Sequence, residues 1–274
     1  MSNSSNQSTK RNFIRVLKIT VFVLVVVMIV KTVDQSLVEF QKSELDLGSL
    51  DIQRLLISAG LYCLGLFCFA YMWHRALCIL KQSPTLSESF GSYFLSQLGK
   101  YVPGKALVVV IRSERVKSSR TTLATAITAV FIETLSMMAV GAVLGGLFIV
   151  FFGNGTHDSK LFWISGLLAL AAGVPSAPPV FRAVIGFLSR RKVGSSLPEY
   201  VENVTLQTMT PCWLVGIVGW LLLGGSMAAC LSAIPVELFP TPFSAADFGV
   251  ITASVALALV AGFISLIPGG AGVR

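Results

Sequence analysis

The strongest constraint on this chain is a series of long apolar segments separated by short polar loops. Six segments, at about 13–33, 53–73, 121–152, 161–180, 212–234 and 247–267, have the length a helix needs to cross a membrane. Hydrophobic residues make up 54% of the chain and charged residues only 12%, and a soluble globule could not bury that much apolar surface. The sequence therefore predicts an all-α membrane protein, a polytopic bundle of about six transmembrane helices, and excludes soluble enzymes and DNA-binding domains.

The positions of the basic residues predict how the bundle is oriented. A cytoplasmic N-terminus places 17 of the 21 Lys and Arg residues on the inner side and leaves Lys31, Lys42, Arg54 and Lys160 outside, as the positive-inside rule expects. The net charge of +8 then reports topology and contact with anionic lipid, so no nucleic-acid partner is expected. Residues 1–12 are predicted to be a disordered cytoplasmic N-terminus, and residues 13–274 a single membrane domain.

Residues 85–111 are predicted to form a re-entrant segment rather than a span. Over 85–98, apolar residues such as Phe90 and Phe94 share one helical face, while Ser and Glu residues lie mostly on the other. The stretch is too short and polar to cross the membrane, so it either lies in the inner interface or dips in and returns. The breaks at Pro103 and Gly104, followed by an apolar run from Ala106, favour the re-entrant alternative.

The break in this segment is the first candidate site. Lys100, Lys105 and Arg112 flank Pro103 and Gly104 on the predicted inner side. Freed backbone N–H groups and cationic side chains suit an anionic lipid headgroup, because phosphate accepts hydrogen bonds from both. The alternative is an ordinary basic cytoplasmic loop.

Glu133 is the second candidate because it lies about twelve residues into an apolar span. A carboxylate at that depth is costly and generally faces a partner or a wet cavity. The candidate partners are Arg112 and Lys105. The alternative is a structural buried acid, which could be protonated.

The third candidate is the glycine-rich C-terminal segment, in which Pro268, Gly269 and Gly270 precede Arg274. Glycines after a proline let backbone approach backbone or ligand closely. Because the chain stops inside this turn, we expect the membrane domain to be truncated at its C-terminus.

Other residue types indicate structural roles. The two histidines and five cysteines show no metal-site spacing, and neither a hydrolytic triad nor a phosphate-binding glycine loop is recognisable. We therefore expect no catalytic residues, metal ligands or cofactors. The glycines of the spans, among them Gly141 and Gly224, fit close helix packing. The four tryptophans, at positions 73, 163, 213 and 220, are interpreted mostly as anchors at the membrane interface.

Taken together, the motifs resemble the flippase-like transmembrane domain of the bacterial lysylphosphatidylglycerol synthetases. The resemblance rests on Leu98 to Lys105, then Arg112, then Glu133, then Leu266 to Arg274, and covers the chain from about residue 13 to its end. It implies a multi-pass protein of the bacterial inner (plasma) membrane that moves a phospholipid between leaflets. Two departures stand out: the family pattern carries Arg after the membrane Glu and an acid soon after, where Thr134 and Met137 stand here. The family also continues beyond the position of Arg274.

Three functions are compatible with these residues. The first is a flippase-like protein that binds or translocates a phospholipid or polyprenyl-linked lipid, with Lys105, Arg112 and Arg274 holding the phosphate and Glu133 balancing the charge. The second is a membrane enzyme that acts on a lipid carrier. The third is a non-catalytic partner in a cell-envelope complex. Further candidate partners are a second copy of the chain or a separate lipid-modifying enzyme. The first function is favoured, and aminoacyl transfer is not expected because a soluble transfer domain is missing.

Overall fold

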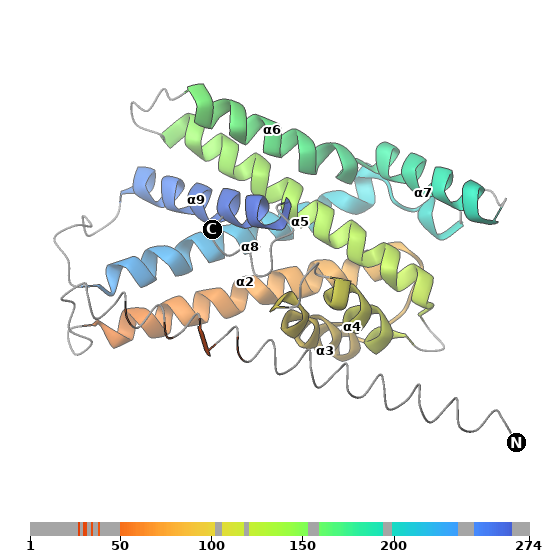
Figure 1. Ribbon diagram of the computed structural model, residues 1–274, viewed down its shortest axis with the longest axis horizontal. Coiled ribbons are helices and arrows are strands. Elements are labelled where there is room, and N and C mark those ends of the chain that lie inside the picture. Colours follow the sequence, from red (N-terminus) through yellow and green to blue (C-terminus); the bar gives the residue numbers. More distant parts are fainter. Residues whose placement is uncertain are drawn as a thin grey trace, which may run out of the picture.

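The described part of the chain is an all-α bundle. The computed structural model describes residues 50–101, 106–117, 121–152, 159–193, 199–234 and 244–264, together with single positions at 27, 30, 31, 34 and 38. Its elements (Figure 1) are α2 (Ile52–Ile79), α3 (Leu86–Ser96), the 3-10 helix η2 (Gln97–Tyr101), α4 (Ala106–Val116), α5 (Leu123–Phe152), α6 (Ser159–Ser176), α7 (Pro178–Val193), the 3-10 helix η3 (Glu199–Val201), α8 (Leu206–Ser232) and α9 (Ala245–Ile264).

Four of the six predicted spans are confirmed as helices that can cross a membrane. Among the described residues, α2, α5, α8 and α9 are long and apolar enough to do so. The predicted span at 13–33 and the predicted N-terminus at 1–12 fall outside the described residues, apart from single positions at 27, 30 and 31. The predicted span at 161–180 is formed by α6 and the first residues of α7.

The proline cluster after this fourth segment divides it into two helices. α6 includes Pro175 and continues to Ser176, and α7 begins at Pro178. At the end of α6 the Ser176 hydroxyl and the Ala177 amide donate to the Gly173 carbonyl, at 2.8 and 3.1 Å, so the last turn is hydrogen-bonded although Pro175 has no backbone donor. Pro178, at the first position of α7, loses no helical hydrogen bond, because a backbone N–H at this position would have no acceptor within the helix.

Small residues let the central helices approach one another closely. A Cβ added to Gly65 of α2 would lie 3.2 Å from the Gly219 carbonyl oxygen of α8. Along the same contact, the Ser58 and Ser226 hydroxyls each donate to the other residue's carbonyl, at 2.7 and 2.9 Å. Gly141 of α5 faces the fully buried Trp220. The prediction that the glycines of the spans serve close packing is confirmed at these positions.

Contacts between loops show that the predicted inner and outer loops gather at opposite ends of the bundle. At one end, called here the hairpin end, the Thr122 amide donates to the Gln82 side chain at 3.1 Å, and Lys81 pairs with Glu199 at 2.8 Å. The hydrogen bond and charge of Glu199 raise the pKa of Lys81, and those of Lys81 lower the pKa of Glu199. At the other end, the Asp51 amide donates to the Ala233 carbonyl at 3.0 Å. The alternation of loops agrees with the predicted topology, and the side facing the cytoplasm stays a prediction.

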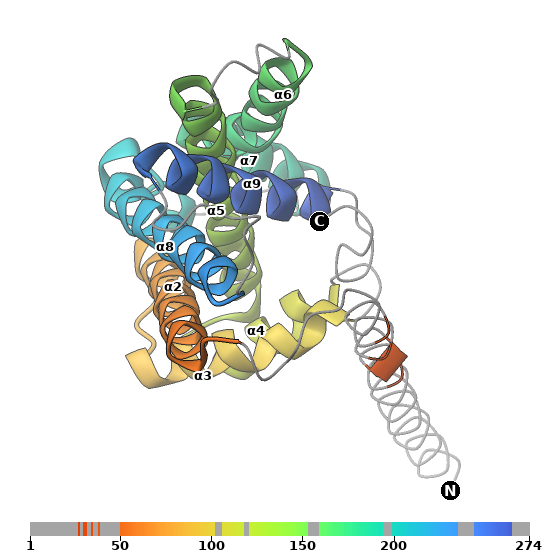
Figure 2. The same ribbon diagram turned by 90° about the vertical axis from the view of Figure 1, so that its left-hand side faces the viewer.

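The segment predicted to be re-entrant forms a helical hairpin whose two ends meet. α3 begins after Gln82, a capping box of Thr85 and Glu88 fixes its start, and α4 returns toward Thr122, which bonds to Gln82. Figure 2 shows α3 and α4 together along one edge of the bundle, beside α2. Large apolar side chains face outward, with Leu86 55% and Leu98 63% exposed. This outward apolar face suits insertion into lipid.

Candidate functional site

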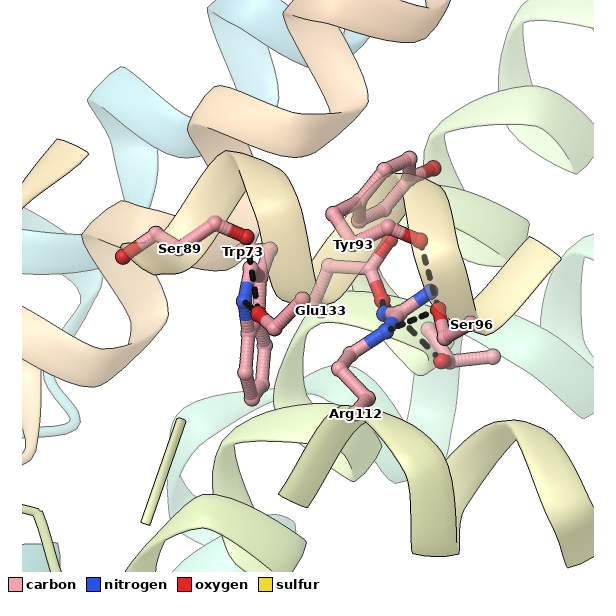
Figure 3. Close-up of polar contacts among 8 residues, drawn as sticks. Trp73, Ser89, Tyr93, Ser96, Arg112 and Glu133 are labelled. Atoms are coloured by element: carbon pink, nitrogen blue, oxygen red, sulfur yellow. Dashed lines mark hydrogen bonds and ion pairs between the residues drawn. The ribbon is translucent and has the colours of Figure 1, made fainter. Parts of the chain in front are cut away.

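A buried ion pair joins the hairpin to α5 (Figure 3). The Arg112 guanidinium of α4 donates through Nη1 to Oε2 of Glu133 at 2.6 Å. Both residues are only 3% exposed. The prediction that Glu133 has a cationic partner in this segment is confirmed, with Arg112 as that partner. The guanidinium lies within hydrogen-bond distance and offsets the cost of burying a carboxylate at this depth.

Two aromatic rings and a serine hold the guanidinium in place. The Cζ atom of Arg112 lies 4.4 Å from the centroid of the Tyr93 ring and 5.3 Å from that of the Trp73 ring, distances at which a cation is attracted to the π face. Its Nε donates to the Ser96 hydroxyl at 3.1 Å. Figure 3 shows Tyr93 and Ser96 from α3 and Trp73 from α2 around the pair.

The polar face of α3 points into the protein and organises this site. Ser89, Ser92 and Ser96 follow a spacing of three and four residues, so they share one helical face, and all three are fully buried. The Trp73 indole N–H donates to the Ser92 hydroxyl at 3.0 Å. The Ser89 hydroxyl lies 2.9 Å from Nδ1 of His74. The serines of α3 therefore position both the Trp73 ring and the Arg112 guanidinium.

Sequence reasoning missed these supporting residues. The serine spacing was the available signal, but a polar helical face is equally typical of an exposed surface. Trp73 was interpreted as an interfacial anchor, and that interpretation is wrong for Trp73 and Trp220, both of which are fully buried. Each indole N–H has an internal acceptor, the Ser92 hydroxyl for Trp73 and the Met137 carbonyl for Trp220, so neither ring needs the interface to satisfy it.

Further polar groups lie near the pair in sequence. Thr134, at the position where the resembled pattern carries arginine, donates its hydroxyl to Oε2 of Glu133 at 3.2 Å. The hydroxyls of Ser113 and Ser136 are buried and have no hydrogen-bond partner within the described part of the chain. Ser113 directly follows Arg112, and Ser136 lies one turn beyond Glu133. Buried hydroxyls of this kind generally bind water or a ligand oxygen.

The arrangement offers one anionic and one cationic group inside an apolar bundle. Removing either partner alone leaves a costly unpaired charge. A ligand can replace one partner only if it brings the matching charge: a phosphate for Arg112, or an amine for Glu133. The pair is thus suited to a charged group rather than to a purely apolar one.

Of the ten predicted headgroup-binding residues, the structure brings together Arg112 and Glu133. Lys100 lies in η2, on the hairpin between α3 and α4, and only its backbone is described. The others lie outside the described residues: Pro103, Gly104, Lys105, Pro268, Gly269, Gly270 and Arg274. Their part in headgroup binding stays a prediction.

Comparison with known proteins gives one informative match. A family model described as the lysylphosphatidylglycerol synthase TM region matches residues 15–274. The matched range includes the hairpin, both members of the ion pair and the C-terminal Pro-Gly segment. Neither a curated protein nor a solved structure matches the chain.

Proposed function

The chain belongs to the lysylphosphatidylglycerol synthase TM region family, and from this premise we propose that it binds a phospholipid or lipid-linked headgroup and moves it between leaflets. Membership makes it an integral membrane protein with a lipid-related role. The single observation that carries the finer proposal is the Arg112–Glu133 pair. The two side chains carry opposite charges, so the pair has no net charge, and it is buried between a helical hairpin and a membrane-spanning helix.

The pair provides a way to lower the barrier that a headgroup meets in the bilayer. A phosphate that leaves water needs charged donors in place of its hydration shell. Arg112 supplies them, and Glu133 is left free to accept an amine of the headgroup or to hold a second cation. Because Arg112 lies on the hairpin and Glu133 on α5, separating the two elements exposes both charges together. The hairpin is therefore the element that we propose to move.

Translocation by a variant without the pair tests this proposal. Replacing Arg112→Met and Glu133→Met together removes both charges and leaves no unpaired ion, so the protein should still fold. In proteoliposomes with a fluorescent phosphatidylglycerol read out separately in each leaflet, we expect translocation to slow by about tenfold or more, the loss of at least one strong transition-state interaction. The recovered lipid should have an unchanged mass, because we propose movement without group transfer.

A second ion pair on the hairpin provides the matched control. Glu114 lies on α4 and Lys117 directly after its end, and they pair at 4.0 Å, but both are more than half exposed. The double change Glu114→Met and Lys117→Met removes the same two charges from the hairpin without touching the site. Translocation at the wild-type rate is expected for this control. Equal rates for the wild type and the Arg112–Glu133 double variant would overturn the proposal.

We propose that the hairpin end of the bundle faces the cytoplasm of a bacterial cell, with the protein in its plasma membrane. Ser83 lies exposed at the hairpin end and Gln53 exposed at the opposite end. With single cysteines at these positions, a membrane-impermeant maleimide added to intact cells should label Gln53→Cys, and should label Ser83→Cys only after lysis. The reverse pattern would invert the topology.

A further inference from the structure

We infer that α7 lies in the membrane interface at the hairpin end of the bundle and binds anionic lipid headgroups there. α6 has 18 residues, so it is about 27 Å long at the usual helical rise, close to the thickness of the hydrocarbon core of a bilayer. One residue, Ala177, separates it from α7. Figure 1 shows α7 extending past the ends of α2 and α5. A helix in this position begins near the boundary between hydrocarbon and headgroups.

α7 turns one apolar face toward the bundle and leaves a second one exposed. Phe181, which is buried, and Ile185 pack against the core of the protein and hold the helix in place. Val180, Val184 and Phe187 are 37%, 49% and 63% exposed. Their spacing of four and three residues aligns them in a single stripe along the helix. An exposed apolar stripe of this kind marks a surface that meets a membrane or a partner.

The charges of α7 identify an anionic partner. The helix carries Arg182, Arg190, Arg191 and Lys192 and, over its full length Pro178–Val193, no Asp or Glu. Its net charge of +4 is half of the net charge of the whole chain, +8. A helix with an apolar stripe and an excess of Lys and Arg binds membranes that contain anionic lipid, because hydrocarbon covers the stripe while the cations meet the headgroups.

The position of the stripe favours a bilayer over a protein as the partner. On α6, the side chains of Leu167, Leu170 and Val174 are all at least half exposed, and their spacing of three and four residues forms a stripe as well. Lipid surrounds this part of a membrane bundle. The chain passes from this stripe to that of α7 within six residues, from Val174 to Val180. The exposed face of α7 therefore continues a surface that lipid already covers.

Quenching of a fluorophore on the stripe by two different lipids tests the inference. In a background without the native cysteines, an NBD label is attached to Phe187→Cys. The protein is placed in phosphatidylcholine nanodiscs that contain an equal fraction of nitroxide-labelled phosphatidylglycerol or nitroxide-labelled phosphatidylcholine. We expect the label to emit as in an apolar environment. The labelled phosphatidylglycerol should associate about fivefold more strongly, the contribution of one cation near an anionic surface. The same label on Ser83→Cys, exposed at the hairpin end, should emit as in water.

Two pairs of substitutions separate the charge of α7 from the charge of the whole chain. Arg190→Gln together with Arg191→Gln should remove most of the preference for the anionic lipid, while the label stays in an apolar environment. Arg115→Gln together with Lys117→Gln removes the same charge from exposed positions on the hairpin, so the preference measured at α7 should not change. High salt should weaken the preference, because it screens exposed charges.

Several outcomes would overturn the inference. They are emission of the α7 label as in water, equal quenching by the two lipids, or a preference that both pairs of substitutions lower equally. A label that emits as in an apolar environment but is quenched by neither lipid would mean that protein covers the stripe, and it would also reject the inference. The readout depends neither on translocation nor on the Arg112–Glu133 pair, so it is decided separately from the proposed function.

Discussion

Glu133→Ala is expected to destabilise the protein by about 3–5 kcal/mol, among the largest effects of any single substitution. The change leaves the Arg112 guanidinium 3% exposed and without its carboxylate, and neither Ser96 nor the aromatic rings can neutralise a full charge. The measurement is the unfolding free energy in mixed micelles, from titration with a denaturing detergent. Arg112→Ala should cost a similar amount, because it leaves the carboxylate of Glu133 unpaired.

The double variant Arg112→Met, Glu133→Met distinguishes a charge effect from reduced packing. If an unpaired charge is the main cost, the double variant should be more stable than either single variant, Arg112→Met or Glu133→Met, and the two effects should be far from additive. Additive losses would mean that each side chain contributes through its own contacts, and the ion pair would then have no special weight. The exposed pair of Glu114 and Lys117 should show only a small effect in the same cycle, within about 1 kcal/mol.

The sequence predicts the frame of the bundle well because membrane insertion depends on a simple quantity. The length of an apolar run determines whether a helix can cross, and this identified α2, α5, α8 and α9 with no knowledge of their contacts. The depth of Glu133 within its run likewise indicated a partnered carboxylate. The choice between Arg112 and Lys105 was left open, because spacing alone does not say which side of a broken segment returns to α5.

The remainder of the site could not be predicted, for physical reasons. In water a helix turns its serines outward, whereas in lipid it can turn them inward, and the pattern of α3 is the same in both cases. Ser89, Ser92 and Ser96 are inside, where they bond to His74, Trp73 and Arg112 respectively. Trp73 itself is of a residue type common among interfacial anchors and lies near the end of a predicted span. Its contact with Ser92 of α3 instead places it inside the protein.

The second large stability effect is expected at the interface between α8 and α9, where Gly224→Ala should destabilise the protein by about 1–3 kcal/mol. A Cβ on Gly224 would lie 2.7 Å from the Cβ of Thr252 and 2.9 Å from its Cγ2, and it would also overlap the hydroxyl. Thr252 is fully buried and donates to the Phe248 carbonyl, so it cannot rotate away without breaking that bond. The helices must therefore separate. In a membrane this is costly, because van der Waals packing is the main attraction between helices.

Two comparisons on the same unfolding assay identify the clash as the cause. Gly60→Ala on α2 introduces the same methyl group where nothing lies within 4 Å, so it should leave stability unchanged or raise it by up to about 1 kcal/mol. Thr252→Gly in the Gly224→Ala background moves the small residue to the other helix and should recover part of the stability. Equal destabilisation by Gly60→Ala and Gly224→Ala would show that alanine is unfavourable in these helices for a local reason. The close approach of α8 and α9 would then contribute little, and glycine at 224 would need another explanation.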